Sequence, residues 1–489
     1  MPSMTSSKTS DNLPAGTLTV TGLHPSGAGL STFEGLTVLV PGAIPGDVVD
    51  ARWTPPKPGG RFGLAQSFTV VSASPDADPT RCPLADACGG CPAGRLRYEA
   101  ELAVKTRLLL EEPLRAAGFA VPVETPAGQP EGARTGFRNK AILRPVRIDG
   151  KLRFGMYRAR SHEVVPAEDC PQTPAWMAEA LRRTAEVLTE VPLYDEKTGE
   201  GILRAVLLRD GAVGGTTDEE PGKAARTRLL TPVLKSFEAV NLQGLDAMLR
   251  AALAGRDGRE EKEDLRVTLI WRENAEPGNA VPGPGRSWSA DAVDAIDARV
   301  MDDIFAVGPD TFLQVNAVQT PVLYRKAIDA LELTGDEDLL DLYSGVGTIT
   351  LALARRTKGR VLGIEVNPKS VENARRNAAR AGLENRTRFE AGLVEDLLSN
   401  LLAEEASAGF RPVKAVIDPA FKGIEASVAK ALGDAGLTRL VYVSCNPQTF
   451  VRDAKRLEAE GLTLVRVEAV DMFPGALHLE AVGTFVRNG

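Results

Sequence analysis

Short apolar segments alternate with longer amphipathic ones from about residue 296 to the end of the chain. The apolar segments DLLDLYS, RVLGIEV, VKAVID and RLVYVS have the length and composition of buried strands. Helix-like segments such as PKSVENARRNAARAG and PQTFVRDAKRLEAEG separate them. Strands that alternate with helices of about 10–15 residues predict an α/β domain built on a doubly wound, parallel, Rossmann-like sheet.

The N-terminal part follows other patterns. Residues 17–75 hold short apolar runs separated by Gly, Pro and Ser, which predicts a small β-barrel. The part that follows mixes strand-like and helix-like segments, and its polar stretches 210–226 and 254–287 indicate surface insertions or linkers. We therefore expect a disordered tail (1–13), the barrel (14–75), a central mixed α+β domain (76–295) and the doubly wound domain (296–489).

Composition and charge narrow the class of protein. The 489 residues are 43% apolar and 25% charged, as in ordinary soluble proteins. No apolar run approaches the ~20 residues of a transmembrane helix, and the N-terminus lacks the apolar core of a secretory signal. We therefore expect a cytoplasmic monomer with no membrane partner. The net charge of −7, taken alone, argues against a polyanionic partner.

One local stretch has the opposite charge. Residues 134–160, RTGFRNKAILRPVRIDGKLRFGMYRAR, contain nine basic residues and one acid, with three aromatic residues interleaved. Charge runs are usually solvated faces, but basic residues with aromatic neighbours also bind phosphates and stack on bases. Both interpretations stay open, and Arg138 and Lys140 are candidate RNA contacts. The aromatic residues are Phe137, Phe154 and Tyr157.

Polar residues and glycines gather where the predicted strands of the C-terminal domain end. Gly345 and Gly347 follow the first strand and open a helix, where they allow a ligand to approach the backbone. Glu365 ends the next strand, and a carboxylate there can accept both hydroxyls of a ribose. Without a phosphate-binding lysine, the pattern fits S-adenosylmethionine as well as NAD. Asp418 is either an acceptor for a planar ligand or a helix N-cap.

Cys445 ends a predicted strand in the stretch VYVSCNPQTF. A cysteine in this position can be an inert core residue, and the stretch by itself favours that interpretation. The carboxyl ends of parallel strands, however, hold the ligands of open α/β sheets. Asp418 and the glycine turn are expected at the same edge, so the thiol is expected in the crevice beside them.

Six ordered motifs give the C-terminal domain a specific resemblance. They match motifs of the RNA 5-methyluridine methyltransferases: FLQVN (312–316), DLYSGVGT (341–348), GIEVN (363–367), DPAFKG (418–423), SCNP (444–447) and DMFPGALHLE (471–480). The resemblance implies a class I methyltransferase domain and S-adenosylmethionine-dependent methylation of uracil C5 in RNA. It also implies that a thiolate adds to C6, that C5 takes the methyl group, and that a base then removes the C5 proton.

The resemblance assigns roles to individual residues. Cys445 falls at the position of the nucleophile and Glu480 at that of the base, near the end of a predicted strand. Phe312 falls near the target base, on which it can stack. Five positions contact the cofactor beside the glycines Gly345 and Gly347: Gln314, Tyr343, Thr348, Glu365 and Asp418.

The N-terminal part extends the resemblance. GLHPSGAGL and VPGAIPGDVV resemble a TRAM domain, an OB-like RNA-binding barrel. Cys82, Cys88, Cys91 and Cys170 match the spacing of the family's iron–sulfur site, which implies a [4Fe–4S] cluster. Zinc is the alternative, because four thiolates suit either metal. TRAM domain and cluster together resemble the bacterial 23S ribosomal RNA branch of the family, and transfer RNA is the alternative substrate.

Four positions depart from the family pattern. Phe421 stands where an arginine is usual in the Asp-Pro motif, and Leu393 stands where relatives often have Asn or Asp. Thr348 replaces a frequent Asn, and Gly94 replaces a common Gln. Phe421 and Leu393 leave open a non-catalytic RNA-binding assembly factor on the same fold. Retention of both the nucleophile and the base argues against it.

Overall fold

The computed structural model describes residues 13–78, 82–85, 87–159, 161–211, 228–254, 265 and 267–487. The expected tail up to residue 12, most of the stretch 210–226 and Arg160 lie outside the described residues. The chain forms two compact units. One consists of Met1–Leu109 with Phe473–Leu477, and the other of Leu110–Met472 with His478–Gly489.

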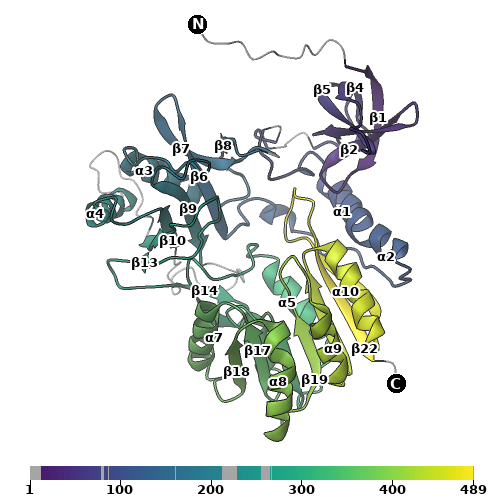
Figure 1. Ribbon diagram of the computed structural model, residues 1–489, viewed down its shortest axis with the longest axis vertical. Coiled ribbons are helices and arrows are strands. Elements are labelled where there is room, and N and C mark those ends of the chain that lie inside the picture. The colour runs from purple at the N-terminus through teal and green to yellow at the C-terminus, as the bar shows by residue number, and fades with distance from the viewer. Residues whose placement is uncertain are drawn as a thin grey trace. The chain divides into compact units, whose positions relative to one another are not determined.

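The first unit contains a closed barrel of five strands, as its turn-rich pattern predicts (Figure 1). The strands are β1 (Ala15–Leu23), β2 (Ala28–Phe33), β3 (Leu36–Pro41), β4 (Val48–Thr54) and β5 (Phe62–Ser72). Alternate residues of β4 point inward, which places Val49, Ala51 and Trp53 in the barrel core. A closed five-stranded barrel is consistent with an OB-like domain.

A short segment from far along the chain completes the first unit. Phe473–Leu477 lies against helix α1 (Tyr98–Thr106). Lys105 Nζ donates to the carbonyl oxygen of Phe473 over 3.0 Å, and the amide of Gly475 donates to Glu101 Oε1 over 2.6 Å. Lys105 and Glu101 are both buried and form an ion pair with each other. The middle of the motif DMFPGALHLE is therefore part of this unit.

The central part of the second unit is a mixed sheet with two helices. Its strand order is β13–β12–β10–β9–β6–β7–β8, and β11 also pairs with β10. The strands are β6 (Lys140–Ile148), β7 (Lys151–Tyr157), β8 (Val164–Pro166), β9 (Leu203–Asp210), β10 (Arg228–Leu234), β11 (Val267–Leu269), β12 (Trp271–Glu273) and β13 (Ser287–Trp288). Helices α3 (Ala175–Val187) and α4 (Leu242–Leu253) pack against each other and contribute to its core. The expectation of a polar insertion at 254–287 was wrong for the part that forms β11–β13, because strands of two or three residues leave no alternating pattern.

The C-terminal part of the second unit is the predicted doubly wound sheet. Its order is β18–β17–β16–β19–β20–β22–β21, in which β16–β20 run parallel and β22 runs antiparallel to both neighbours. The strands are β16 (Asp338–Leu342), β17 (Val361–Glu365), β18 (Thr387–Ala391), β19 (Pro412–Ile417), β20 (Arg439–Ser444), β21 (Leu462–Val470) and β22 (Glu480–Arg487). A separate hairpin, β14 (Ile296–Val300) and β15 (Asp303–Val307), precedes the sheet.

Two sets of helices cover the faces of this sheet (Figure 1). Helices α5 (Thr320–Asp329), α6 (Thr348–Ala354) and α7 (Pro368–Ala381) neighbour one another. Helices α8 (Val394–Ser407), α9 (Ala426–Asp434) and α10 (Pro447–Ala459) form the other set. Within the described part of the chain, none of the helices has the length and apolar character needed to cross a membrane.

Candidate active site

The strands of the C-terminal sheet bring the predicted site residues to one edge. Glu365 ends β17, Asp418 follows β19 and Cys445 follows β20, and these strands run parallel. Their carboxyl ends therefore share an edge of the sheet. Glu480 begins β22 rather than ending a strand, which corrects the prediction of its place. Because β22 is antiparallel and pairs Ala481 with Ser444, Glu480 and Cys445 still lie on neighbouring strand ends.

The turn after β16 provides an open backbone surface. Gly345 and Gly347 have φ angles of 55° and 85°, which favour glycine. A Cβ atom added to Gly345 would meet no atom within 4 Å, whereas one on Gly347 would lie 3.0 Å from the ring of Phe389. Gly345 therefore faces open space, and Gly347 allows close packing of the helix on the strand. Tyr343 also has a positive φ, of 65°, at the start of this turn.

Glu365 is held in place by the backbone. Its Oε2 accepts from the amide of Gly345 over 3.0 Å, and its Oε1 accepts from the amide of Asn367 over 2.8 Å. A carboxylate has about four lone-pair positions, so two stay available for the hydroxyls of a ribose. The Glu365 carboxylate therefore suits the ribose of S-adenosylmethionine, and the open glycine turn leaves room for the cofactor beside the backbone.

Two carboxyl groups lie together beside the nucleophile. Glu480 is buried, Asp418 is partly buried, and the Gln314 side chain hydrogen-bonds to Asp418. Burial raises the pKa of Asp418 to about 7. Burial, and then the charge of Asp418, raises the pKa of Glu480 well above its ordinary value. A negative charge on one of these acids disfavours ionisation of the other, so they keep a proton to higher pH than isolated carboxyl groups do.

Cys445 is a partly buried thiol in a fixed turn. The next residue, Asn446, caps helix α10, because its side chain accepts from the amide of Gln448 over 3.1 Å. Burial, followed by the charges of Glu480 and Asp418, raises the pKa of the Cys445 thiol to about 12. Without a ligand the thiol is therefore protonated at neutral pH, and it needs a change in its surroundings to become a thiolate.

The central sheet holds the segment that carries Phe312. Arg209 Nη2 donates to the carbonyl oxygen of Thr311 over 2.8 Å, and Asn139 Nδ2 donates to that of Gln314 over 2.9 Å. Gln314 is buried, whereas Phe312 is 59% exposed. The segment thus presents one aromatic ring outward and one amide inward toward Asp418.

Lys140 is the first residue of β6, which lies between β9 and β7 in the central sheet, and Arg138 lies two residues before it. Lys140 is partly buried beside Arg209 and Asp310, and burial, followed by the charge of Arg209, lowers its pKa to about 7. Arg138 donates from Nε to Gln172 Oε1 over 2.9 Å, and forms a bridge with Asn316. Both residues therefore adjoin the Phe312 segment, although each already has protein neighbours.

The remainder of the basic stretch 134–160 forms the β6–β7 hairpin, and part of its prediction was wrong. Phe137 and Phe154 are buried, so neither ring is available to stack on a base. In a strand successive side chains alternate between faces, which turns Phe154 inward while the preceding Arg153 faces outward. Tyr157 stays partly exposed and stacks on His162 at a centroid distance of 5.2 Å. Two arginines pair with local acids, Arg153 with Glu168 and Arg158 with Glu163, each at 2.8 Å.

The four cysteines of the predicted cluster are divided between the units. Cys82, Cys88 and Cys91 follow β5 and precede α1 in the first unit, and Cys170 belongs to the second. All four are partly exposed and none is in a disulfide. Within the described ranges, no group of three or more His, Cys, Asp or Glu side chains is arranged to hold a metal ion. Three accessible thiols within one ten-residue segment are nonetheless a donor set that suits iron–sulfur clusters and zinc.

Three residues near the site were not anticipated as contributors. Asp341 is buried in β16, where burial raises its pKa to about 7. Tyr324 OH accepts a hydrogen bond from Thr348 Oγ1 at 3.2 Å, and Arg209 supports the Phe312 segment. Asp341 lies within a recognised motif, but an acid in a short strand gives no signal of its burial.

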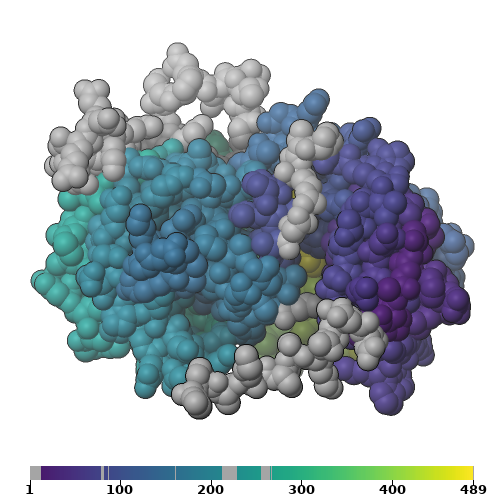
Figure 2. All heavy atoms as spheres, turned by 90° about the horizontal axis from the view of Figure 1, so that it is seen from above, coloured from purple at the N-terminus to yellow at the C-terminus, as the bar shows by residue number. Residues whose placement is uncertain are grey.

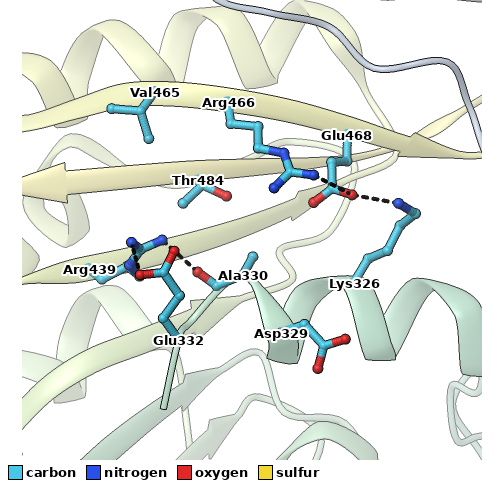
Figure 3. Close-up of a pocket in the computed structure, with 9 residues that line it drawn as sticks. All are labelled: Lys326, Asp329, Ala330, Glu332, Arg439, Val465, Arg466, Glu468 and Thr484. Atoms are coloured by element: carbon cyan, nitrogen blue, oxygen red, sulfur yellow. Dashed lines mark hydrogen bonds and ion pairs between the residues drawn. The ribbon is translucent and has the colours of Figure 1, made fainter. Parts of the chain in front are cut away.

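A separate pocket of about 500 Å³ lies between α5 and strands β20–β22 (Figure 3). Two ion pairs lie among its charged side chains, Lys326 with Glu468 at 2.5 Å and Arg439 with Glu332 at 2.5 Å. Arg439 is the first residue of β20, so the pocket lies toward the opposite end of that strand from Cys445. The nine residues that line it include none of those predicted for catalysis or cofactor binding.

Comparisons with known proteins identify the family. The family described as tRNA (Uracil-5-)-methyltransferase matches residues 296–488. An uncharacterized RNA methyltransferase of Gloeobacter violaceus is 36% identical over 479 residues, 96% of each chain. Another from Listeria monocytogenes is 31% identical over 471 residues, 95% of each chain.

A solved structure extends the likeness to the whole fold. The crystal structure of the Pyrococcus abyssi tRNA (uracil-54, C5)-methyltransferase in complex with S-adenosyl-L-homocysteine matches 96% of this chain and 99% of that chain. The TM-score is 0.69 and the sequence identity 25%. The C-terminal domain thus has the class I S-adenosylmethionine-dependent methyltransferase fold. With relatives above 30% identity over nearly its full length, the chain belongs to the tRNA (uracil-5-)-methyltransferase family and is an RNA methyltransferase.

Proposed function

We propose that the protein methylates C5 of a uridine in RNA through a covalent bond between Cys445 Sγ and C6 of uracil. The register of β22 against β20 carries this proposal, because it sets Glu480 beside the thiol. A nucleophile and a base on neighbouring strand ends are the two groups that the reaction needs.

The reaction distributes its steps between these residues. The thiolate of Cys445 forms a bond to C6, and the C5–C6 electron pair moves to C5 and the adjacent carbonyl. Bound S-adenosylmethionine would supply the methyl group that C5 takes, and S-adenosylhomocysteine would be released as the sulfur–methyl bond breaks. Ionised Glu480 then accepts the C5 proton, the C5–C6 double bond forms again, and the bond between sulfur and C6 breaks. A raised pKa makes Glu480 a stronger base, which favours this proton transfer.

The cofactor is proposed to lie along the carboxyl edge of the sheet. Glu365 would accept the ribose hydroxyls, and the turn with Gly345 and Gly347 would leave room for the ligand. Gln314, Tyr343, Thr348 and Asp418 complete the proposed contacts. Burial and mutual repulsion raise the pKa of the Asp418 and Glu480 carboxyls and of the Cys445 thiol, so binding of a positively charged cofactor would favour the charged forms that the reaction uses.

RNA recognition is assigned to several parts of the chain. Phe312 would stack on the target base, and Arg138 and Lys140 would contact nearby phosphates. The barrel is proposed to be a TRAM domain that binds RNA. Cys82, Cys88, Cys91 and Cys170 are proposed to hold a [4Fe–4S] cluster, with zinc as the alternative, and no chemical step is assigned to it.

The proposed substrate is 23S ribosomal RNA, because the barrel and the cysteine set both resemble that branch of the family. Transfer RNA is the second candidate, which the full-length likeness to the Pyrococcus abyssi transfer RNA enzyme favours. Mass mapping of 5-methyluridine in ribosomal and transfer RNA from a deletion strain would distinguish them. If the deletion strain keeps all of its 5-methyluridine in both ribosomal and transfer RNA, the proposal is contradicted.

Two variants test the mechanism. Cys445→Ala should abolish methyl transfer and form no covalent adduct with 5-fluorouridine RNA, while cofactor binding survives. Glu480→Gln should transfer the methyl group and then stall, so that a protein–RNA adduct accumulates on ordinary uridine RNA. A Glu480→Gln enzyme with normal turnover would remove Glu480 from the mechanism, and methylation by Cys445→Ala would remove the thiol.

A further inference from the structure

Phe421 is an exposed aromatic residue attached to the catalytic edge. It lies in the turn after β19, and it is 61% exposed. Its carbonyl oxygen accepts from Asn446 Nδ2 over 2.9 Å, and Asn446 directly follows Cys445. This hydrogen bond therefore links the backbone of Phe421 to Asn446, the residue next to the proposed nucleophile.

The turn that carries Phe421 is anchored on its other side as well. Asp453 is fully buried and accepts from the amide of Ile424 over 2.9 Å and from Tyr442 OH over 2.9 Å. Arg452 pairs with Asp453 and donates from Nη2 to the carbonyl oxygen of Lys422 over 2.7 Å. The backbone on both sides of the ring is thus fixed, so a ligand that stacks on Phe421 orders little further chain.

Gly423 shows how tightly this anchor is packed. Its φ is 73°, and an added Cβ atom would lie 2.1 Å from Asp453 Oδ2. The backbone at Gly423 therefore packs directly on the buried Asp453, while the nearby ring of Phe421 stays exposed. A single exposed apolar residue needs no explanation in general, but one presented on a rigid turn beside a nucleophile does.

The neighbouring charge indicates which ligand fits. Lys422 is exposed, and within the described ranges its ammonium group has no ion pair. An aromatic face next to a free cation suits a single-stranded nucleic acid, in which a base stacks on the ring and a phosphate meets the cation. The family's Asp-Pro motif usually has an arginine at this position. That arginine offers a positive charge, whereas Phe421 offers an aromatic ring.

The chemistry of the reaction decides which base Phe421 can meet. The thiol and the methyl donor both approach the target uracil perpendicular to its ring, at C6 and C5. Phe312 is proposed to stack on the uracil away from C5 and C6, so a second phenyl ring on this base would block the thiol or the methyl donor. Phe421 must therefore serve a different nucleotide.

We propose that Phe421 stacks on the nucleobase next to the target uridine in the RNA chain, and that Lys422 contacts the phosphate there. This inference rests on the proposed function and extends it, because it makes Phe421 a determinant of which RNA is bound. Loss of one base–aromatic stack weakens binding by about 5- to 150-fold.

The test combines protein variants with abasic RNA. The probe is a short single-stranded RNA with one central uridine between adenosines, with or without an abasic site directly 5′ or 3′ of the uridine. Dissociation constants are measured with S-adenosylhomocysteine present. Phe421→Ala should weaken binding of the intact RNA about 5- to 150-fold, and Phe421→Trp should restore it. One of the two abasic RNAs should lack the base on which Phe421 stacks. For that RNA, wild type and Phe421→Ala should have the same dissociation constant.

Several outcomes would overturn the proposal. Phe421→Ala could leave the affinity unchanged, or it could weaken intact and both abasic RNAs by the same factor. Lys422→Gln provides an independent check, since losing one phosphate contact should reduce the slope of log affinity against log salt by about 0.7. An unchanged slope would remove Lys422 from the contact.

Failure of the proposed function gives a different result. If wild-type protein forms no adduct with 5-fluorouridine RNA, the covalent mechanism fails, whatever the stacking measurements give. If wild type and Phe421→Ala both form the adduct at saturating RNA, and the dependence on the adjacent base is absent, only the stacking proposal fails.

Discussion

Replacing Asp341 by asparagine should stabilise the protein at high pH and much less at low pH. Asp341 is 1% exposed, and its Oδ2 accepts from Thr350 Oγ1 over 2.5 Å. Its Oδ1 has no hydrogen-bond partner within the part of the chain that the structure describes. Asparagine has the shape of the protonated carboxyl group and keeps an acceptor for Thr350. The variant therefore removes the charge and little else.

The pKa of Asp341 gives the magnitude. Burial raises it from 3.8 to about 7 in the folded chain. A carboxyl group with a raised folded pKa binds more protons in the folded than in the unfolded state, so it destabilises the fold increasingly as pH rises from about 4 to about 7. Linkage between these two pKa values gives a loss of about 2–3 kcal/mol in the free energy of unfolding between pH 5 and pH 8. Asp341→Asn should escape that loss.

Thermal unfolding of the intact chain measures the effect. The melting temperature of Asp341→Asn relative to wild type should rise between pH 5 and pH 8 by several degrees, at about 2–4 °C per kcal/mol. Asp336→Asn is the matched control, because Asp336 is an exposed acid of the same domain whose side chain is 78% accessible. A difference between Asp341→Asn and wild type that stays constant with pH would refute the burial of an ionisable charge at this position.

Three other predictions follow from the site and the cysteines. Alkylation of Cys445 in cofactor-free protein should quicken about tenfold per pH unit up to pH 9, since burial and nearby acids raise its pKa to about 12, and a plateau below pH 9 would contradict this. Protein purified without oxygen should be brown and contain iron and sulfide, whereas stoichiometric zinc without iron would exclude the cluster. Reversing Arg138 and Lys140 to Glu should weaken RNA binding and flatten its salt dependence, and unchanged affinity would make this stretch an ordinary solvated face.

The doubly wound domain could be predicted from local patterns, because each parallel strand is a short apolar run followed by a helix. The antiparallel strand β22 was harder to place, since its residues Glu480–Arg487 carry no sign of strand direction. Direction decides whether Glu480 lies at the catalytic edge or at the opposite one. Only the pairing of Ser444 with Ala481 resolves this, and such pairing joins positions far apart in the sequence.

Burial of charge could be predicted least, because desolvation depends on neighbours from several strands. Asp341, Asp418 and Glu480 each look like an acid at a strand end, and the sequence separates them by tens of residues. The sheet brings them into one group, in which the charge of Asp418 contributes to raising the pKa of the other two. Such a group opposes folding, and enzymes keep similar groups where a strong base or a positively charged ligand is needed. Burial also distinguishes Asp341, to which no motif assigns a role, from the acids on the surface. The pH dependence of Asp341→Asn therefore tests whether these acids form one buried group.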